Sequence, residues 1–397
     1  MRQLIPLIFI LISSSALAQE LDTGDTLLEF RDGIHYEYDP AKFGAHFRFR
    51  MQNRFTYQTE DTKSLAPDEA NFEVRRTRLR LDGHVFDERL LYKIQLSFTR
   101  GDLDFDRTEY PNILRDAAVG WKLSDNTNIW YGQTKLPGNR QRLISSGSQQ
   151  FVDRSLVNST FNIDRDTGIF LNHKQGQEMP FWVKLAISNG EGRSTNNKDS
   201  GLAYTARVEW LPLGSFKDGG DFLEGDLARE LTPKISMGAA YSMNKKANKP
   251  AGQTGTEFEV EGLSRDMENF FADFLFKYRG FAWSTEYAKR WSEDPVISAA
   301  DNNGKEVVIF KGQGFNTQAS YIFENNYEIA ARFSKIWGDR EIRNFASDTK
   351  QYTVGVSKYI NEHTVKIQTD LSYFEETIGR GPDHQYWAYR LQLEVGI

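Results

Sequence analysis

Polar and apolar side chains alternate along most of the chain. From residue 45 to residue 57, apolar side chains such as Phe47 and Phe49 occupy the odd positions, and polar ones such as Arg48 and Arg50 occupy the even positions. A period of two residues places these sets on opposite faces of a β-strand. The same alternation recurs at 90–99, 181–188, 204–210, 235–243, 270–278, 281–291, 315–323, 327–333, 352–356, 365–373 and 387–397. Weaker alternation at 76–85, 116–123, 129–135 and 168–173 brings the predicted total to about sixteen strands, an even number that suits a closed up-and-down barrel.

The connections between these strands alternate between short and long. The short ones span 87–89, 124–127, 176–179, 279–280, 324–326 and 361–362. The long ones span 58–71, 100–112, 136–167, 190–202, 244–268, 292–311, 338–350 and 374–385. Short turns at one rim and long loops at the other are the pattern of an outer-membrane barrel. The acidic stretch 211–233 breaks this rule, because it is long where a short turn is expected, and we interpret it as an insertion.

A soluble β-sandwich or a secreted all-β hydrolase would also show alternation. In those folds the apolar face is a core of branched aliphatic residues, whereas here aromatic residues stand at both ends of a strand, as at Phe281 and Trp291. Such aromatic girdles are typical of membrane barrels. The last strand alternates up to the C-terminal Ile397, although most outer-membrane barrels end in an aromatic residue. We therefore predict an all-β, transmembrane antiparallel barrel.

The N-terminus has the features of a secretory signal peptide. Arg2 precedes an apolar run over residues 4–12, and the small-residue site Ala16-Leu17-Ala18 follows. That run is too short to cross a bilayer as a helix. We predict a signal peptide over 1–18, a periplasmic segment over 19–44 and a barrel over 45–397, in contact with the lipid and lipopolysaccharide of a Gram-negative outer membrane. The chain has no cysteine, which excludes disulfides and cysteine metal sites.

Arginines recur at alternate positions of one predicted strand. Arg76, Arg78 and Arg80 share one face, and Leu79 and Leu81 share the other. An arginine at the middle of the lipid face costs about 2–4 kcal/mol, so these three must face the lumen. The preceding strand adds arginines on its polar face. The predicted anion pathway comprises Arg48, Arg50, Arg54, Arg75, Arg76, Arg78 and Arg80.

A hairpin between these two strands would place like charges side by side. With like faces together, we expect Arg54 near Arg76 and Arg50 near Arg80. Directly opposed like charges are destabilising unless water or an anion lies between them, so the pattern favours an anion path. The alternative is an ordinary porin wall, in which scattered arginines only bias a general diffusion pore. The formal net charge of −6 and the lack of a basic run exclude a nucleic-acid partner.

Several short strings resemble those of the phosphate-selective porin O and P family. They are RRTRLRLDG at 75–83, LRDAAVGWKL at 114–123, IWYGQTKLP at 129–137, FVDRS at 151–155 and ISNGEG at 187–192. The similarity covers most of the chain beyond the signal peptide. It implies a homotrimer of sixteen-stranded barrels, each with its own pore narrowed by inward-folded loops, which carries phosphate or other small anions.

The resemblance also implies a constriction site. The family's constriction loop carries a basic residue, a serine pair and an acid–arginine pair, and family phosphate sites use an acid on the preceding strand. The matching positions here are Arg142, Ser145, Ser146, Asp153, Arg154 and Asp116. Guanidinium forks and hydroxyl groups fit phosphate oxygens, and a carboxylate can accept the proton of hydrogen phosphate. Arg142 stands where the family often has lysine, and Gly147-Ser148 lacks a second lysine.

Other functional classes have weaker support in the sequence. The six histidines are scattered, with no H-E-x-x-H pair and no G-x-S-x-G elbow, so a barrel hydrolase is a distant alternative. A sugar or carboxylate channel with an aromatic stacking track stays open. Asp102, Asp104 and Asp106 alternate in a long loop, but without the glycine and glutamate of a calcium loop they indicate a solvated acidic loop. We expect no cofactor and no metal.

Overall fold

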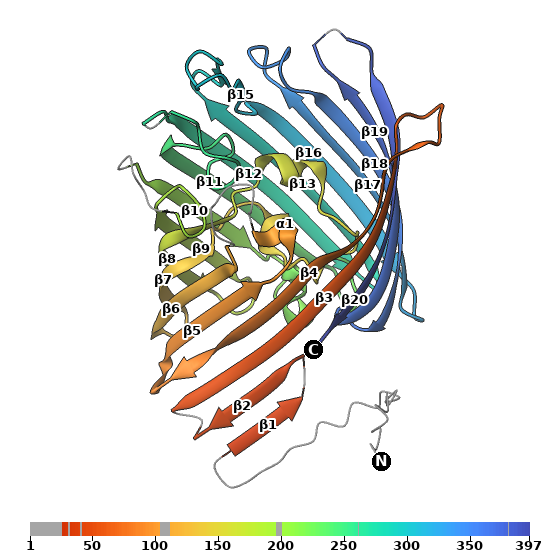
Figure 1. The fold of residues 1–397 in the computed structure, drawn as a ribbon. Helices are drawn as coiled ribbons and strands as arrows, with labels where there is room; N and C mark the ends of the chain where they lie inside the picture. Colours follow the sequence, from red (N-terminus) through yellow and green to blue (C-terminus); the bar gives the residue numbers. More distant parts are fainter. Residues whose placement is uncertain are drawn as a thin grey trace, which may run out of the picture.

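Sixteen antiparallel strands form a closed barrel in the computed structural model, which describes residues 26–397 except 31, 40–41, 104–111, 196–200, 261 and 380. Each strand pairs with the next along the chain, and β20 (His384–Gly396) pairs with β3 (Phe43–Thr59) to close the barrel (Figure 1). Between them run β4 (Pro67–Val85), β5 (Asp87–Ser97), β6 (Leu114–Ser124), β7 (Thr127–Lys135), β8 (Arg165–Gln175), β9 (Phe181–Ser188), β10 (Ala203–Trp210), β11 (Lys234–Ala247), β12 (Arg265–Tyr278), β13 (Phe281–Ser292), β16 (Gly312–Ile322), β17 (Tyr327–Gly338), β18 (Asp348–Asn361) and β19 (Val365–Thr377). The predicted strand number and barrel class are confirmed.

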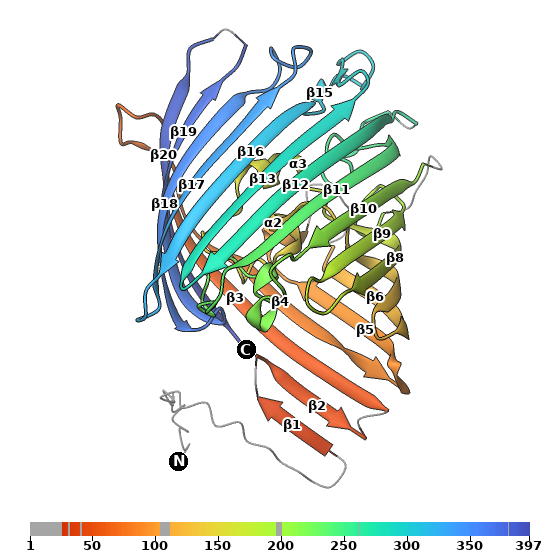
Figure 2. The same cartoon turned by 180° about the vertical axis from the view of Figure 1, so that it is seen from behind.

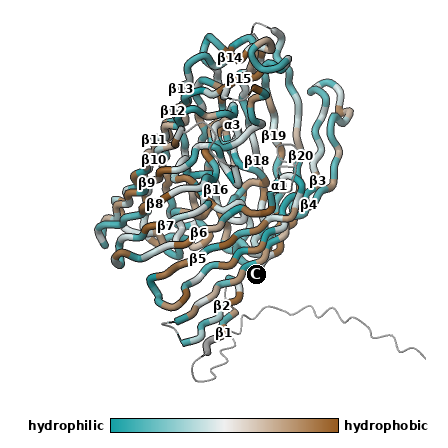
Figure 3. The backbone as a smooth tube through the Cα atoms, turned by 60° about the vertical axis from the view of Figure 1, so that its left-hand side comes forward, coloured by the Kyte–Doolittle hydropathy of each residue, from teal (hydrophilic) through white to brown (hydrophobic). Residues whose placement is uncertain are grey.

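The alternation in the sequence corresponds to side chains that face the lipid and side chains that face the lumen in turn. On β20, Leu391 and Leu393 are 41% and 42% exposed on the outer face, whereas Gln392 and Glu394 are 1% and 0% exposed inside. Figure 3 shows apolar and polar positions following one another along the strands. Apolar residues cover the outside because hydrocarbon, not a protein core, is their environment. Within the described residues, none of the helices has the length and apolar character needed to cross a membrane.

Several strands extend beyond their alternating segments. β4 begins at Pro67 rather than near residue 76, and the first long loop shrinks to 60–66. The added part carries polar side chains, such as Asp68, Glu69 and Asn71, on both faces. Outside the bilayer both faces of a hairpin meet water, so hydrogen bonding alone sustains the strands and alternation is not required.

The two rims differ as the connection lengths predict. The C-terminus and the short turns lie at one end, and the long loops lie at the other (Figure 1). One long loop, 293–311, holds a small hairpin of β14 (Val296–Ile297) and β15 (Val307–Val308). At the turn end, β1 (Thr26–Phe30) and β2 (Ile34–Tyr38) form a ribbon that pairs with the start of β3. The predicted signal peptide lies outside the described residues.

Two connections fold into the barrel instead of staying at a rim. The constriction loop, residues 136–164, carries α2 (Arg140–Leu143) and α3 (Leu156–Phe161). The inner turn segment, residues 211–233, carries the 3₁₀ helix η1 (Lys217–Phe222). Figure 2 shows α2 and α3 of the constriction loop behind the near strands, and the inner turn segment, in green, close to the turn end. The resemblance implied an inward constriction loop, and the structure shows it.

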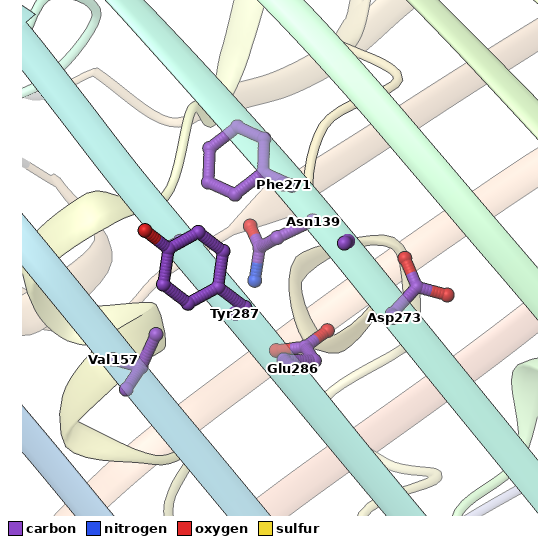
Figure 4. A pocket seen from close by; sticks show the side chains of 8 residues that line it. Asn139, Val157, Phe271, Asp273, Glu286 and Tyr287 are labelled. Atoms are coloured by element: carbon purple, nitrogen blue, oxygen red, sulfur yellow. The ribbon is translucent and has the colours of Figure 1, made fainter.

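The hydrophobic core lies between the constriction loop and the barrel wall. Val157 and Phe161 of α3 are almost fully buried against Phe271 of β12 and Ala288 of β13. Residues from both sides also line a small pocket there: Asn139, Val157, Phe271, Asp273, Glu286 and Tyr287 (Figure 4). Arg140 Nε donates to Asp273 Oδ1 over 2.6 Å, which ties α2 to the same wall. The loop is therefore attached by apolar packing and by charged hydrogen bonds.

Gly132 on β7 provides a test of the barrel packing. Its φ is +126°, and an added Cβ would lie 2.3 Å from the backbone oxygen of Ala117 on β6. We expect Gly132→Ala to destabilise the barrel by at least about 2 kcal/mol, because both the backbone conformation and the strand spacing would have to change. The measurement is the temperature at which the folded band is lost in semi-native electrophoresis. Gly304→Ala, also at positive φ but with no atom within 4 Å of its Cβ, is the control and should change this temperature much less.

Candidate functional site

The predicted arginines form a ladder along one side of the lumen. Arg48 pairs directly with Arg80, and Arg50 pairs with Arg78, across β3 and β4. The predicted register is therefore wrong by two residues, since Arg50 had been placed near Arg80. Arg54 lies opposite Glu73, and Arg76 lies opposite Gln52. A shift by an even number of residues keeps the same side chains inside, so alternation cannot detect it; the short hairpin loop sets the register.

Two β-bulges place additional charges on the lumenal face. Between Arg76 and Val74 the register shifts, and Arg75 is the unpaired extra residue. On β6 the register shifts between Asp116 and Leu114, which leaves Arg115 as the extra residue. Arg115 and Asp116 are both buried although they are consecutive. Bulges thus let neighbouring charges share the lumen, where regular pleating would send one of them to lipid.

Each carboxylate beside the ladder is shared by more than one cation. Asp82 contacts Arg48 at 2.6 Å and Arg80 at 2.7 Å. Four more acids are shared within 4.0 Å: Glu73 by Arg54 and Arg75, Asp153 by Arg54, Arg76 and Arg390, Asp102 by Arg78 and Arg115, and Glu394 by Arg50 and Lys366. Positive charge therefore exceeds negative charge along this wall.

The serine pair of the constriction loop meets the middle of the ladder. Arg50 Nη2 donates to Ser146 Oγ over 2.7 Å, and Arg78 Nη1 donates to the same oxygen over 3.0 Å. Arg50 Nη1 donates to Ser145 Oγ over 3.2 Å. Ser145 is exposed and Ser146 is buried. Two guanidinium groups and two hydroxyls thus converge at the tip of the constriction loop.

Asp153 attaches the far end of the constriction loop to the ladder. Its carboxylate accepts from Arg54 Nη1 over 2.7 Å and from Arg54 Nη2 over 3.0 Å. Burial opposes ionisation of this carboxyl, yet the nearby Arg54 and Arg390 hold its pKa well below the usual value. The group stays charged at neutral and mildly acidic pH, and the stability from its ion pairs is lost only as the pH falls through that lowered pKa.

The other predicted site residues lie apart from the serine pair. Arg142 Nε donates to Asp164 over 2.7 Å. Arg154 donates to the backbone oxygens of Gln141 and Ile144, over 2.7 and 2.8 Å, and so holds the loop's own backbone. Asp116 accepts two hydrogen bonds from Arg165, both 3.1 Å long. These three charged groups are occupied by protein partners.

The sequence interpretation missed several charged residues of the lumen. Asp102, in the short helix α1 (Arg100–Leu103), is buried, which corrects the prediction of a solvated acidic loop at this position. It accepts from Arg78 Nε over 2.8 Å and from Ser97 Oγ over 2.7 Å. Its alternating partners Asp104 and Asp106 lie outside the described residues. Among the residues that are described, no cluster of histidine and carboxylate side chains could hold a metal ion.

A closed membrane barrel with an inward loop and a charged lumen defines an outer-membrane porin, a channel protein. The chain belongs to the phosphate-selective porin O and P family, whose model matches residues 46–377. It is thus located in the outer membrane, as predicted. No curated protein sequence matches the chain.

Solved structures with little sequence similarity share the fold. The outer membrane channel DcaP of Acinetobacter baumannii aligns with a TM-score of 0.56 at 13% identity, over 90% of this chain and 100% of that one. Salmonella typhi OmpF, in complex with daunomycin, gives 0.54 at 13% identity, over 90% and 99%. OmpT of Vibrio cholerae, described as an outer membrane protein in a trimer form, gives 0.54 at 10% identity, over 89% and 99%.

The shared acid Asp153 can be tested by Asp153→Asn. Its loss leaves Arg54, Arg76 and Arg390 with less compensation, so we expect the reversal potential across a salt gradient to shift towards chloride. The shift follows because lumenal charges lie within about 8 Å, one Debye length at physiological salt, of a passing ion. Asp61→Asn removes the same charge from the exposed 60–66 loop and serves as the control. Equal shifts in both variants would contradict a special role for Asp153.

Proposed function

We propose that this porin carries small anions by passive diffusion along the arginine ladder. The observation that supports the proposal is the sharing of carboxylates: five acids are each shared by two or three basic side chains. Local excess charge governs a permeating ion more than the formal net charge of −6, since distant charges are screened. An anion in the lumen would reduce the repulsion between opposed arginines.

Phosphate is the anion that the constriction chemistry fits best. Ser146 Oγ accepts from both Arg50 and Arg78, so its own proton is available to donate to an anion. An anion beside the serines would receive charged hydrogen bonds from two guanidinium forks and two hydroxyls, and phosphate has more acceptor oxygens than chloride. Because the same arginines already have internal partners, binding is weak enough for release, as conduction requires.

The sequence resemblance placed the phosphate site at Arg142, Ser145, Ser146 and Arg154, with Asp116 nearby. We now centre the proposal on the serines with Arg50 and Arg78. Arg142, Arg154 and Asp116 are assigned to holding the constriction loop and its surroundings, because their polar atoms contact Asp164, loop carbonyl groups and Arg165.

A general diffusion pore, a sugar or carboxylate channel and a barrel hydrolase are the competing functions. The six histidines lie on five different strands and in one turn. His46 contacts the backbone oxygen of Asp32, and His173 contacts the side chain of Thr127. We propose a channel without enzymatic activity, assembled as a homotrimer in lipid and lipopolysaccharide, with a cleaved signal peptide and residues 19–44 in the periplasm. Cross-linking of the purified protein in detergent would test the trimer.

The purified pore should conduct chloride in preference to potassium, and phosphate should reduce its chloride current. The excess of arginines predicts the first result, and a resident anion predicts a block that saturates with phosphate concentration. Both are measured in a planar bilayer, from the reversal potential across a KCl gradient and from single-channel current during phosphate titration. A cation-selective reversal potential would favour a general pore instead.

The substitution Ser146→Ala distinguishes a specific phosphate site from a lumen that is only basic. The substitution removes a hydroxyl but no charge, so chloride conductance should stay near the wild-type value. A charged hydrogen bond contributes about 1.5–3 kcal/mol, so the phosphate concentration for half block should rise about tenfold or more. Ser148→Ala, in the same loop, is the matched control. If the two variants respond alike to phosphate, the serine site is wrong and only a basic lumen remains.

A further inference from the structure

The inner turn segment, residues 211–233, begins and ends exposed at the turn rim, and its middle part, which includes the buried residues Gly220, Glu224 and Asp226, turns into the barrel. Its polar side chains are internal partners: Asp226 accepts from the backbone N–H of Gly280 over 2.7 Å and from that of Glu230 over 3.1 Å. Lys277 of β12 donates to the backbone oxygen of Leu223 over 2.9 Å. The acidic composition of this segment therefore reflects anchoring to the turn between β12 and β13.

Further along the same wall, the segment also reaches β16 and β17. Arg229 Nη1 donates to the backbone oxygen of Ile322 over 2.6 Å. Gly225 has a φ of +70°, and an added Cβ would lie 2.7 Å from Glu328 Oε1, so the backbone approaches β17 closely. These contacts attach the segment to the wall at several separate strands. Because it is anchored to the wall in this way, the segment can hold the constriction loop in position.

Glu224, at 5% exposure, makes the contact with that loop. Its carboxylate accepts from Gln141 Nε2 over 3.1 Å and from the backbone N–H of Gln150 over 3.0 Å. Its own backbone N–H donates to the backbone oxygen of Ser148 over 2.8 Å. Gln141 precedes the Ser145–Ser146 pair, and Ser148 and Gln150 follow it, so one residue joins both sides of the loop tip.

A second contact strengthens the attachment. Arg140 Nη1 donates to the backbone oxygen of Asp221 over 2.8 Å, while Arg140 Nε holds Asp273 of the wall. The base of the loop tip is therefore fixed between the inner turn segment and β12. The serines then face Arg50 and Arg78 from a tip whose two sides cannot separate without breaking hydrogen bonds to Glu224.

We propose that the inner turn segment sets the width of the pore from the turn side, with Glu224 as the positioning residue that holds the serine pair against the ladder. The inference rests on the protein being a channel, and it does not depend on which ion the channel prefers. Glu224 acts through geometry: two acceptor oxygens and one N–H match three groups of the loop tip.

Two substitutions at Glu224 distinguish the effect of the side chain's length and hydrogen bonds from the effect of its charge. Glu224→Asp keeps the charge but shortens the side chain by one CH₂ group, and Glu224→Gln keeps the length but replaces one acceptor oxygen by a donor. If Glu224 positions the loop, both variants should increase open-channel current noise several-fold, whichever ion carries the current. Glu306→Gln, which removes an exposed glutamate from the 293–311 loop, is the charge-matched control and should behave as the wild type.

Replacing residues 212–232 by a short Asn-Gly turn tests the whole segment. We expect single-channel conductance to rise by about twofold or more, because the loop tip loses its support and the lumen gains space. Wild-type conductance in a folded replacement variant would overturn the proposal. So would an Asp variant that matches the wild type beside a Gln variant with only a shifted reversal potential, since Glu224 would then act by charge. The wild-type reversal potential tests anion selectivity separately.

Discussion

Hydrogen bonding between β20 and β3 closes the barrel, and the other features of the protein depend on this closure. In hydrocarbon no water can satisfy a free strand edge, so every backbone N–H and C=O must pair within the protein. Closure also separates two environments along each strand. Leu391 and Leu393 face lipid, while Gln392 and Glu394 of the same strand face the lumen. Once Glu394 is inside, it contacts Arg50 and Lys366 from neighbouring strands.

The lumen formed in this way contains more basic side chains than its acidic side chains can neutralise. Arg48 and Arg80 stand opposite each other with Asp82 as their shared partner. Removing either cation from the lumen would require a lipid-facing arginine or a different strand register, both of which are costly. The constriction loop supplies some of the compensation through Asp153 and Ser146. Arg50, Arg54 and Arg78 of the ladder therefore also contact the constriction loop, so under the proposed function a change in loop position would change the surroundings of a passing anion.

The inner turn segment shows why composition alone does not reveal whether an acidic segment lies at the rim or inside the barrel. Residues 211–233 read as an acidic insertion at the rim, yet Glu224 and Asp226 accept hydrogen bonds inside the barrel. A similar reversal applies to Asp102, which lies between Arg78 and Arg115 instead of in water. In both cases the partner lies far along the chain or on another strand. Burial of these carboxylates is possible because basic or N–H donors are already present in the lumen.

The sequence by itself determined the number of strands, the class of barrel and the wall that carries the arginines. A two-residue period depends only on local geometry and on which solvent each face meets, so it can be read without knowing the fold. The tertiary structure alone decided the register of β3 and β4, the bulges at Arg75 and Arg115, and the partners of Arg142 and Arg154. Register shifts of two residues leave the alternation unchanged. Loop contacts join residues that are distant in the chain, and no local pattern records which carboxylate or carbonyl group each arginine will find.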